Sequence, residues 1–367
     1  RRATRRGNAA SAARSRCPRP RGRGCAGFDR CDVWYCAPVF HGNRGALDRE
    51  RQACLFDRLD WIDPLHRMAL RNKAPLLLRA HDGATEAWLP LMRQASSHHV
   101  ALANWYNFTW RPIYGDPCAE TTRLSLLRQL ALTARQHTRR LTLAPVPDED
   151  GSASEMAAAF TSAGWVVDRT ECDENHYVRL NGRSFDQYWE SRPGQLKNTV
   201  KRKGKKNIVS TRIETEFSAQ SWSDYERIYA RSWKPHEGSP EFLKQLAQQE
   251  SLAGTARIGL AYIDGKPVAA QFWTVENGIA LIHKLAHDER HLDASPGTLL
   301  SAALFQHVID IDRVDEIDFG TGSDAYKRDW MEAVRPRFRL DMFWPNHVAN
   351  WPLIARLHLR HMRRKAA

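Results

Sequence analysis

Apolar residues along the first half of the chain predict strands and helices in a regular order. Strand-like runs occupy residues 75–80, 86–93 and 99–107, and leucines at helical spacing predict an amphipathic helix over residues 121–137. A short strand at 141–144, a helix at 152–163 and strands at 165–168 and 176–180 follow. The first half therefore predicts three strands, a helix, a strand, a helix and closing strands.

The second half predicts the same order of elements. A helical stretch over 184–206, a strand at 208–217 and helices at 222–233 and 240–252 come first. Strands at 256–263, 267–275 and 279–287 are joined by Asp-Gly and Asn-Gly turns, which are typical of hairpins. A helix, a short strand, a glycine loop, a further helix and a strand at 339–343 follow.

This repeated order predicts an α+β (mixed α/β) fold of two tandem units, each a mostly antiparallel sheet flanked by helices. We expect a disordered Arg-rich leader over 1–45, domains over 46–180 and 181–346, and a basic tail helix over 347–367. The leader is also compatible with a transit peptide, an RNA-binding arm or a wrongly started translation product.

The stretch over 293–330 has the features expected of a binding site. Ser295 can cap a helix, and Pro296 suits its first position, where the missing N–H has no partner in any case. Leu300 and Leu304 recur at helical spacing, so we expect one face of this helix to pack on a sheet.

A glycine loop follows the next short strand. Gly320 and Gly322 let the backbone turn tightly and approach a ligand. Asp324 can cap the following helix, which places Tyr326 and Lys327 in its first turn beside the strand end. We expect a site at this point.

Charge is concentrated at the two ends of the sequence. Of the formal net charge of +13, residues 1–45 contribute +9 and the residues from Pro352 onward contribute +5, so the body is close to neutral. A neutral body excludes a basic DNA-reading domain. The Lys-rich segment 197–206 is either a solvated helix face or a contact for an anionic partner.

The composition also indicates where the protein resides. No stretch approaches the roughly 18 apolar residues of a membrane span, and the N-terminus lacks the apolar core of a signal peptide. We therefore expect a soluble cytoplasmic protein. The seven cysteines form no CxxC pair, so neither a zinc site nor a disulfide framework is indicated, and we expect no metal.

Three segments carry a family resemblance: DASPGTLL, IDFGTGSDAYKRDW and YIDGKPVAAQFW. They resemble the acyl-CoA N-acyltransferase (GNAT) superfamily, and within it the acetyltransferases described as FemAB-like or as the CelD/BcsL type of cellulose biosynthesis. The resemblance covers roughly residues 184–345, and over 47–180 it rests on element order alone. It implies two tandem GNAT-like units, the first of them degenerate.

The resemblance implies that an acyl-CoA donor places its pyrophosphate on backbone N–H groups at the start of the central helix. The matching residues are Ser295, Gly297, Thr298 and Leu299. This corner departs from the usual Gln/Arg-x-x-Gly-x-Gly/Ala loop, because it has one glycine and Pro296 removes a donor. A plain helix N-terminus is the alternative interpretation.

Acyl transfer needs a base for the acceptor's proton, donors for the oxyanion and an acid for the leaving thiolate. The resemblance implies Tyr326 as the acid, and the alternative is a tyrosine that covers the core. His283 is a possible base or a core histidine, on a strand expected to supply backbone donors. Asp318 is a second possible base or an acceptor ligand. For substrate binding we expect Lys284 and Lys327, which could hold phosphate or acid groups.

Three functions follow from these residues. The first is a transferase that moves an acetyl or other acyl group from acyl-CoA to an amine or hydroxyl, on a sugar, a polysaccharide precursor or an amino compound, in exopolysaccharide or cell-envelope biosynthesis. The second is an aminoacyl-tRNA-dependent, Fem-like transferase, which the Lys-rich segment favours and the lack of a long helical-hairpin insertion disfavours. The third is a binding protein that keeps the fold without catalysis.

Overall fold

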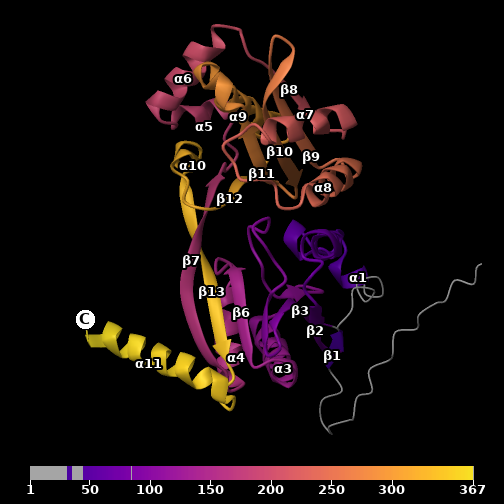
Figure 1. Ribbon diagram of the computed structural model, residues 1–367, viewed down its shortest axis with the longest axis vertical. Helices are drawn as coiled ribbons and strands as arrows, with labels where there is room; N and C mark the ends of the chain where they lie inside the picture. Colours follow the sequence, from indigo (N-terminus) through magenta and orange to yellow (C-terminus); the bar gives the residue numbers. More distant parts are fainter. Residues whose placement is uncertain (1–30, 35–43, 84, 367) are drawn as a thin grey trace, which may run out of the picture. The chain divides into compact units, whose positions relative to one another are not determined.

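The computed structural model describes residues 31–34, 44–83 and 85–366 (Figure 1). The strands of the first half are β1 (Cys31–Trp34), β2 (Pro75–Asp82), β3 (Thr85–Ala95), β4 (His98–Ala101), β5 (Ile113–Tyr114), β6 (Arg140–Val146) and β7 (Val166–Arg179). The helices are α1 (Arg44–Leu47), α2 (Leu59–Pro64), α3 (Glu120–His137) and α4 (Ser152–Ser162), with short helical turns η2 (Leu55–Asp57) and η3 (Leu65–Ala69).

The strands of the second half are β8 (Ser210–Glu214), β9 (Ala256–Ile263), β10 (Lys266–Glu276), β11 (Ile279–His287), β12 (Glu316–Thr321) and β13 (Ala333–Phe343). The helices are α5 (Phe185–Glu190), α6 (Gly194–Gly204), α7 (Ala219–Tyr229), α8 (Pro240–Leu252), α9 (Pro296–Gln306), α10 (Ala325–Trp330) and α11 (Trp351–Ala366). Short helical turns are η4 (Glu289–Ala294), η5 (His307–Ile311) and η6 (Val348–Asn350).

These strands form one sheet in the order β1-β2-β3-β4-β6-β13-β7-β12-β11-β10-β9-β8, and β5 pairs with β3. Among the described strands only β4–β6 and β11–β12 pair in parallel. The expected α+β class, with a mostly antiparallel sheet flanked by helices, is confirmed.

Several predictions differ from the structure, and the strand expected at 339–343 begins as early as Ala333. The two strands expected at 165–168 and 176–180 are one strand, β7, because β13 pairs with it along most of its length. The strand expected at 99–107 ends at Ala101, because the side chain of Asn104 accepts the N–H of Tyr106 in a tight turn. Part of the predicted leader also differs, since Cys31–Trp34 forms β1 against β2; most of that leader lies outside the described residues.

The last strand joins a sheet region far from it in sequence. β13 lies between β6 and β7 and contributes Leu340 and Met342 to the core around α3 and α4. The sequence places this strand within the 181–346 domain, whereas its pairing partners belong to the first half. The domain boundaries themselves stay a prediction.

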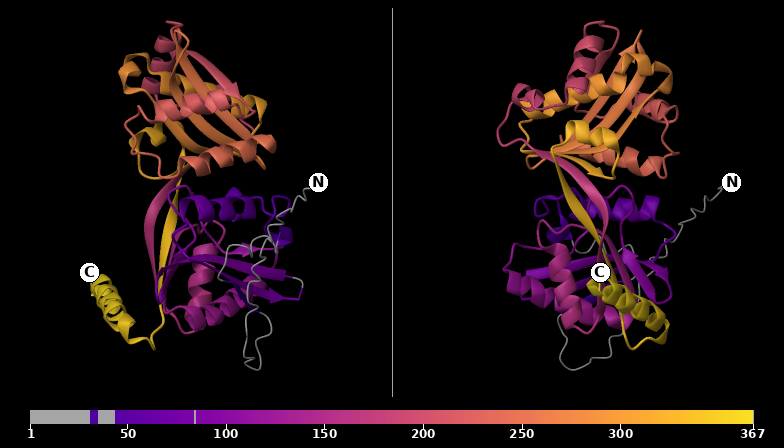
Figure 2. Two further views of the ribbon diagram at one scale, coloured as in Figure 1. Left: turned by 45° about the vertical axis from the view of Figure 1, so that its right-hand side comes forward. Right: turned by 90° about the vertical axis from the view of Figure 1, so that its left-hand side faces the viewer.

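The central strands separate two cores on opposite faces (Figure 2). Leu260 and Phe272 pack with residues of α7 and α8, whereas their neighbours Ala261 and Trp273 pack with residues of α9. Helix α9 lies so close to β9 that a Cβ added at Gly259 would be 2.7 Å from Leu304 Cδ1. The predicted packing of this helix on a sheet is confirmed. This packing holds α9 against β9.

Candidate functional site

Strands β11 and β12 pair over three residues and then separate. Residues 279–281 of β11 pair with residues 316–318 of β12. Beyond that point β12 stays beside β7, where Thr321 faces Asn175, while β11 continues to His287. Among the described residues, no strand lies beside this last part of β11 on the β12 side.

A cavity of about 260 Å³ lies where the strands separate. Its lining comes from β10, β11, β12, the start of α9 and α10, and includes Gln271, Leu285, His287, Ser295, Gly297, Thr298, Phe319 and Tyr326. The structure thus brings the predicted acid together with three of the four predicted donor-binding residues. The fourth, Leu299, does not line this cavity.

The start of α9 presents free backbone donors to the cavity. Ser295 occupies the predicted N-cap position and Pro296 begins the helix, but Ser295 is left-handed, with φ 52°, and its side chain accepts no hydrogen bond from the helix. The first helical hydrogen bond runs from Leu299 N to Ser295 O over 3.1 Å. The N–H groups of Gly297 and Thr298 precede that bond and have no acceptor within the helix. With the positive end of the helix dipole, they suit an anion.

Tyr326 is partly buried in the same cavity. Its ring packs edge-on against Phe319, with ring centroids 5.7 Å apart. Burial raises the pKa of the Tyr326 phenol above its ordinary value, and the charge and hydrogen bond of Asp324 raise it further. The phenol is therefore protonated at neutral pH and can donate a hydrogen bond. Asp324 itself makes no capping hydrogen bond to α10, contrary to the prediction.

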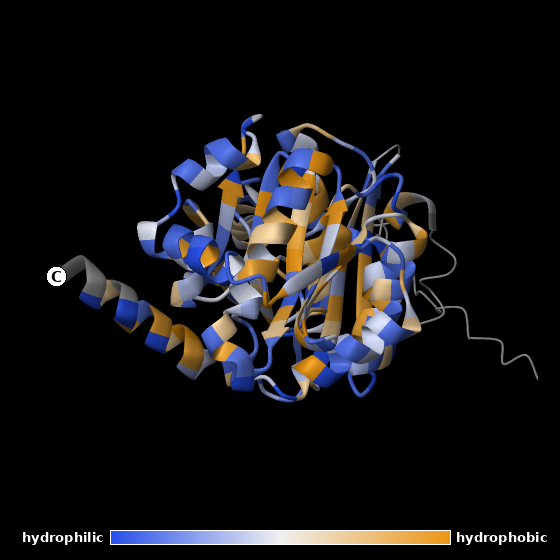
Figure 3. Cartoon of the chain, turned by 90° about the horizontal axis from the view of Figure 1, so that it is seen from above, coloured by the Kyte–Doolittle hydropathy of each residue, from blue (hydrophilic) through white to orange (hydrophobic). Residues whose placement is uncertain are grey.

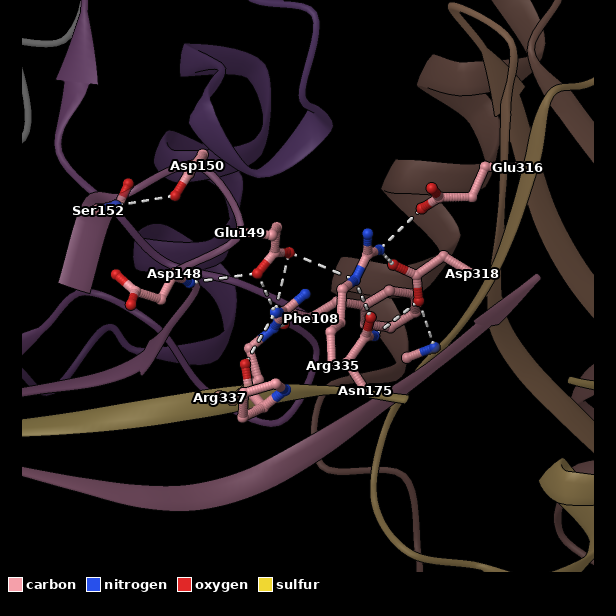
Figure 4. Close-up of polar contacts among 12 residues, drawn as sticks. Phe108, Asp148, Glu149, Asp150, Ser152, Asn175, Glu316, Asp318, Arg335 and Arg337 are labelled. Carbon is pink, nitrogen blue, oxygen red and sulfur yellow. Dashed lines mark hydrogen bonds and ion pairs between the residues drawn. The ribbon is translucent and has the colours of Figure 1, made fainter. Parts of the chain in front are cut away.

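Asp318 lies elsewhere, in a buried polar network (Figure 4). Its carboxylate accepts hydrogen bonds from Asn175 Nδ2 and Gly320 N, both at 2.7 Å, and from Arg335 Nη2 at 2.6 Å. It lines a second cavity, of about 340 Å³, together with Arg335 and Glu149. Asp318 and Tyr326 therefore do not share a cavity, and the catalytic role of Asp318 stays a prediction.

Arg335 is the centre of that network. It contacts the carboxylates of Asp318 at 2.6 Å, Glu316 at 2.9 Å and Glu149 at 3.3 Å, and it donates to Asn175 Oδ1 at 2.6 Å. The Arg335 side chain is 15% exposed. Because several carboxylates face one guanidinium away from water, we expect this network to matter chiefly for stability.

The two predicted substrate-binding lysines already have partners. Lys284 pairs with Glu237 at 3.0 Å and lies over the ring of Tyr106. Lys327 donates to the carbonyl oxygens of Thr321 and Gly322. Burial lowers the pKa of both lysines. Neither lines the cavity at Tyr326, and their predicted substrate contacts stay predictions.

The two predicted loop glycines are required by local packing. Gly320 has φ 71°, and an added Cβ would be 2.8 Å from the Phe108 ring. Gly322 has φ 103°, and its N–H donates to Glu174 O and Asp173 Oδ1, both at 3.0 Å. Such positive φ values favour glycine whatever the function. Their predicted role in substrate binding stays a prediction.

Comparison with known proteins gives one family match. Residues 194–328 match the family model described as an acetyltransferase (GNAT) domain. Over these residues the chain is similar to that family. A search of curated proteins gave no match.

Among solved structures, FemX is 8% identical, with a TM-score of 0.59 over 88% of this chain and 99% of that chain. The C-terminal domain of a protein named as a lysylphosphatidylglycerol synthetase from Agrobacterium fabrum is 13% identical, with a TM-score of 0.55 over 87% of this chain and 96% of that chain. L-PGS from Bacillus licheniformis is also 13% identical, with a TM-score of 0.51 over 83% and 96%. At these identities the likeness shows the fold alone.

Gln271 lines the cavity at Tyr326 and was missed by the sequence reasoning. It is buried on β10, and its Nε2 donates to Ser301 Oγ at 2.7 Å and to Gly297 O at 3.4 Å. Its Oε1 accepts the indole N–H of Trp273 at 2.9 Å. These bonds hold the start of α9 against the sheet. An amide side chain within the largely apolar run 267–275 was the signal that could have found it.

His287 is the second missed residue. Its ring lies 4.4 Å from the ring of Trp233, and an added Cβ at Gly297 would be 3.1 Å from its Nδ1. Burial lowers the pKa of His287. A neutral imidazole at the cavity can accept a proton, which makes His287 a base candidate with better placement than His283. Only its position at the end of β11 could have indicated this from sequence.

His283 occupies the other core. It sits at a bulge where the β10–β11 register shifts, and bulges re-aim side chains. Its Nε2 is 2.8 Å from Thr274 Oγ1, and its ring packs among aromatic rings that include Phe108 and Phe272. It does not line the cavity at Tyr326. Burial, followed by the charge of Lys284, lowers the pKa of His283 to about 3.

This depressed pKa predicts acid sensitivity. Between the ordinary pKa of about 6.5 and the folded value, protons bind the unfolded chain more readily. The stabilisation is therefore complete above about pH 6.5 and is lost as the pH falls toward 3. We expect His283→Gln to reduce the loss of unfolding free energy between pH 7 and 4.5 by about 2 kcal/mol. Denaturant unfolding of the parent and the variant at pH 7 and pH 4.5 measures this loss. If the parent and the variant lose the same unfolding free energy between the two pH values, the prediction is contradicted.

Proposed function

We propose that this protein is an acyl-CoA-dependent transferase that moves an acetyl or other acyl group to an amine or hydroxyl acceptor. The observation that carries the proposal is the cavity at the β11–β12 separation, which joins the free N–H groups of α9 to the phenol of Tyr326. The matching GNAT domain model supports the same activity. In line with the FemAB-like and CelD/BcsL resemblance, we place the acceptor in exopolysaccharide or cell-envelope biosynthesis.

Each residue of the cavity has a role in binding the donor or in moving a proton. Gly297 and Thr298 N–H groups hold the donor's pyrophosphate, and the thioester arm lies along the unpaired end of β11, whose backbone N–H groups polarise the carbonyl. The acceptor nitrogen or oxygen attacks the thioester carbon, so a C–N or C–O bond forms and the C–S bond breaks. His287 takes the acceptor's proton, and Tyr326 gives its proton to the departing thiolate.

A second candidate, the aminoacyl-tRNA-dependent transferase, is favoured by helix α6. This helix carries the Lys-rich segment, and the ammonium group of Lys203 reaches the carbonyl oxygen of Asp293, in the turn that precedes α9. The neighbouring Lys201 and Arg202 are exposed. A basic helix beside the donor corner suits a phosphate of acyl-CoA and equally the backbone of tRNA.

Gly297→Glu tests the donor site. The new carboxylate would lie at the helix start, beside His287, and would repel the donor's pyrophosphate. Two unit charges about 5 Å apart near a protein surface repel by about 3 kcal/mol, so binding should weaken by about two orders of magnitude. Calorimetric titration with acetyl-CoA and with CoA measures the change.

The matched control is Gly45→Glu, because a Cβ at Gly45 meets nothing within 4 Å. This variant should bind acetyl-CoA as the parent does. If the parent binds tRNA in a salt-sensitive manner but neither acetyl-CoA, CoA nor a longer acyl-CoA, the second candidate replaces the first. If it binds none of these ligands, the chain is a binding protein that keeps the fold.

A further inference from the structure

The C-terminal helix α11 carries an exposed apolar stripe. Trp351, Leu359 and Met362 are 59%, 52% and 59% exposed, and Val348, just before the helix, is 66% exposed. The helical positions 351, 355, 359 and 362 repeat every three or four residues, so they lie on one face. Together with Ala355 they form what we call the apolar stripe.

The opposite side of α11 attaches the helix to the rest of the protein. Leu357 is 3% exposed, and the guanidinium of Arg360 pairs with the carboxylate of Asp168. The apolar stripe is therefore not the face through which α11 packs in the described part of the chain. Exposing three large apolar side chains on one helix face is costly in water, which indicates a surface that something covers.

Cations border the apolar stripe. Arg356 and Arg363 are exposed, and the sequence from Trp351 onward contains five arginines and lysines and no acidic residue. Figure 3 shows apolar and hydrophilic residues alternating along α11. An apolar face with a cationic border is typical of helices that lie in the interface of an anionic bilayer.

We propose that α11 docks on an anionic lipid surface, with Trp351, Leu359 and Met362 among the acyl chains and the arginines on lipid phosphates. Nucleic acid fits less well, because phosphate contacts do not need large apolar side chains. A second copy of the chain fits less well too, because two faces bordered by the same charge would repel. No described helix is long and apolar enough to cross a membrane, so the contact is peripheral.

The docking is independent of acyl transfer. Its strength should come from two sources of similar size. Each cation near an anionic surface contributes about five-fold to the binding constant, and this part falls with salt. The buried apolar area supplies a part that salt does not remove. This second part distinguishes α11 from a segment that binds through its cations alone.

Vesicle sedimentation of the full chain tests the proposal. The probes are vesicles of phosphatidylcholine alone and vesicles with one part in three of phosphatidylglycerol. We expect binding to the anionic vesicles only, and at least a ten-fold loss in the double variant Leu359→Glu/Met362→Glu. Brominated lipids should quench a share of the tryptophan fluorescence that the variant Trp351→Phe lacks.

Two control variants have matched chemistry elsewhere on the surface. Leu252→Glu alters an exposed leucine, 92% accessible, at the end of α8, and should bind as the parent does. Arg356→Gln/Arg363→Gln should weaken binding by at least ten-fold at low salt, whereas Lys205→Gln/Lys206→Gln on the α6 side should not. All altered positions are exposed, and circular dichroism checks that each variant folds.

Four results would overturn the proposal. The first is that the parent does not bind anionic vesicles, and the second is that Leu359→Glu/Met362→Glu binds them as the parent does. The third is quenching that persists unchanged in Trp351→Phe, and the fourth is loss of binding in the α6 variant instead of the α11 variants. A parent that dimerises through the apolar stripe, or that holds an RNA duplex more tightly than vesicles in an α11-dependent manner, would overturn it as well.

Discussion

Tyr326→Phe is expected to lower kcat for acyl transfer by at least about 100-fold, the usual contribution of a positioned general acid. The substitution keeps the ring against Phe319 and removes only the hydroxyl group. Because burial and Asp324 keep that hydroxyl protonated, its loss leaves the thiolate without a proton donor in the cavity. The dissociation constant for acetyl-CoA should stay within about two-fold, since the loss concerns the transition state.

Steady-state kinetics with thiol detection measures kcat, and calorimetric titration measures the dissociation constant for acetyl-CoA. Tyr262→Phe is the matched control, because the Tyr262 hydroxyl accepts a hydrogen bond from Arg212 away from the cavity. It should leave kcat unchanged. If Tyr326→Phe retains full kcat, or loses donor binding and kcat in equal measure, Tyr326 is not the acid.

Arg335→Met is expected to lower the free energy of unfolding by about 3–5 kcal/mol, because it leaves the buried carboxylate of Asp318 without its cation. Glu316, by contrast, keeps Arg179, and Glu149 keeps Arg337. Asp318, Glu316 and Glu149 all face the Arg335 guanidinium, and the Asp318 and Glu316 side chains are 6% and 13% exposed. Methionine fills much of the same volume, so the loss reports the charge rather than a cavity. The shift of the denaturation midpoint at constant slope measures it.

Arg328→Met provides the comparison. Arg328 is 67% exposed and contacts Glu174 at 3.6 Å, so its loss should cost under about 1 kcal/mol. A third variant, Asp318→Asn, tests the predicted catalytic role of Asp318. If Asp318→Asn lowers stability while kcat per folded molecule is unchanged, Asp318 belongs to the network; if kcat falls with stability intact, its predicted catalytic role is supported.

Local sequence signals predicted most elements of the second half correctly. The turns at Asp264–Gly265 and Asn277–Gly278 have positive φ at all four residues, as hairpin turns of this length require, so β9, β10 and β11 could be assigned within one residue. Helix α9 was equally clear. Such elements are specified by neighbours in sequence, through turn chemistry and apolar spacing.

Candidate residues were harder to judge than elements. Tyr326 and the start of α9 were selected by resemblance, and the structure places both in one cavity. His283 was selected because it lies on the strand expected to supply backbone donors, and Asp318 because it ends a strand beside the glycine loop, yet each has local partners in the fold. Gln271 and His287, which do line the cavity, gave weaker signals. Which face a strand residue occupies depends on bulges and on strands that separate, and neither is visible in sequence.

The sequence by itself determined the α+β class, the two hairpins, the start of α9 and the charge at the chain's ends, because these depend on contacts between near neighbours. Only the tertiary structure decided that β13 inserts between β6 and β7, that Arg335 meets three carboxylates, and that β11 leaves β12 beside Tyr326. Each of these joins residues far apart along the chain, and such pairing is selected by the packing of the whole sheet.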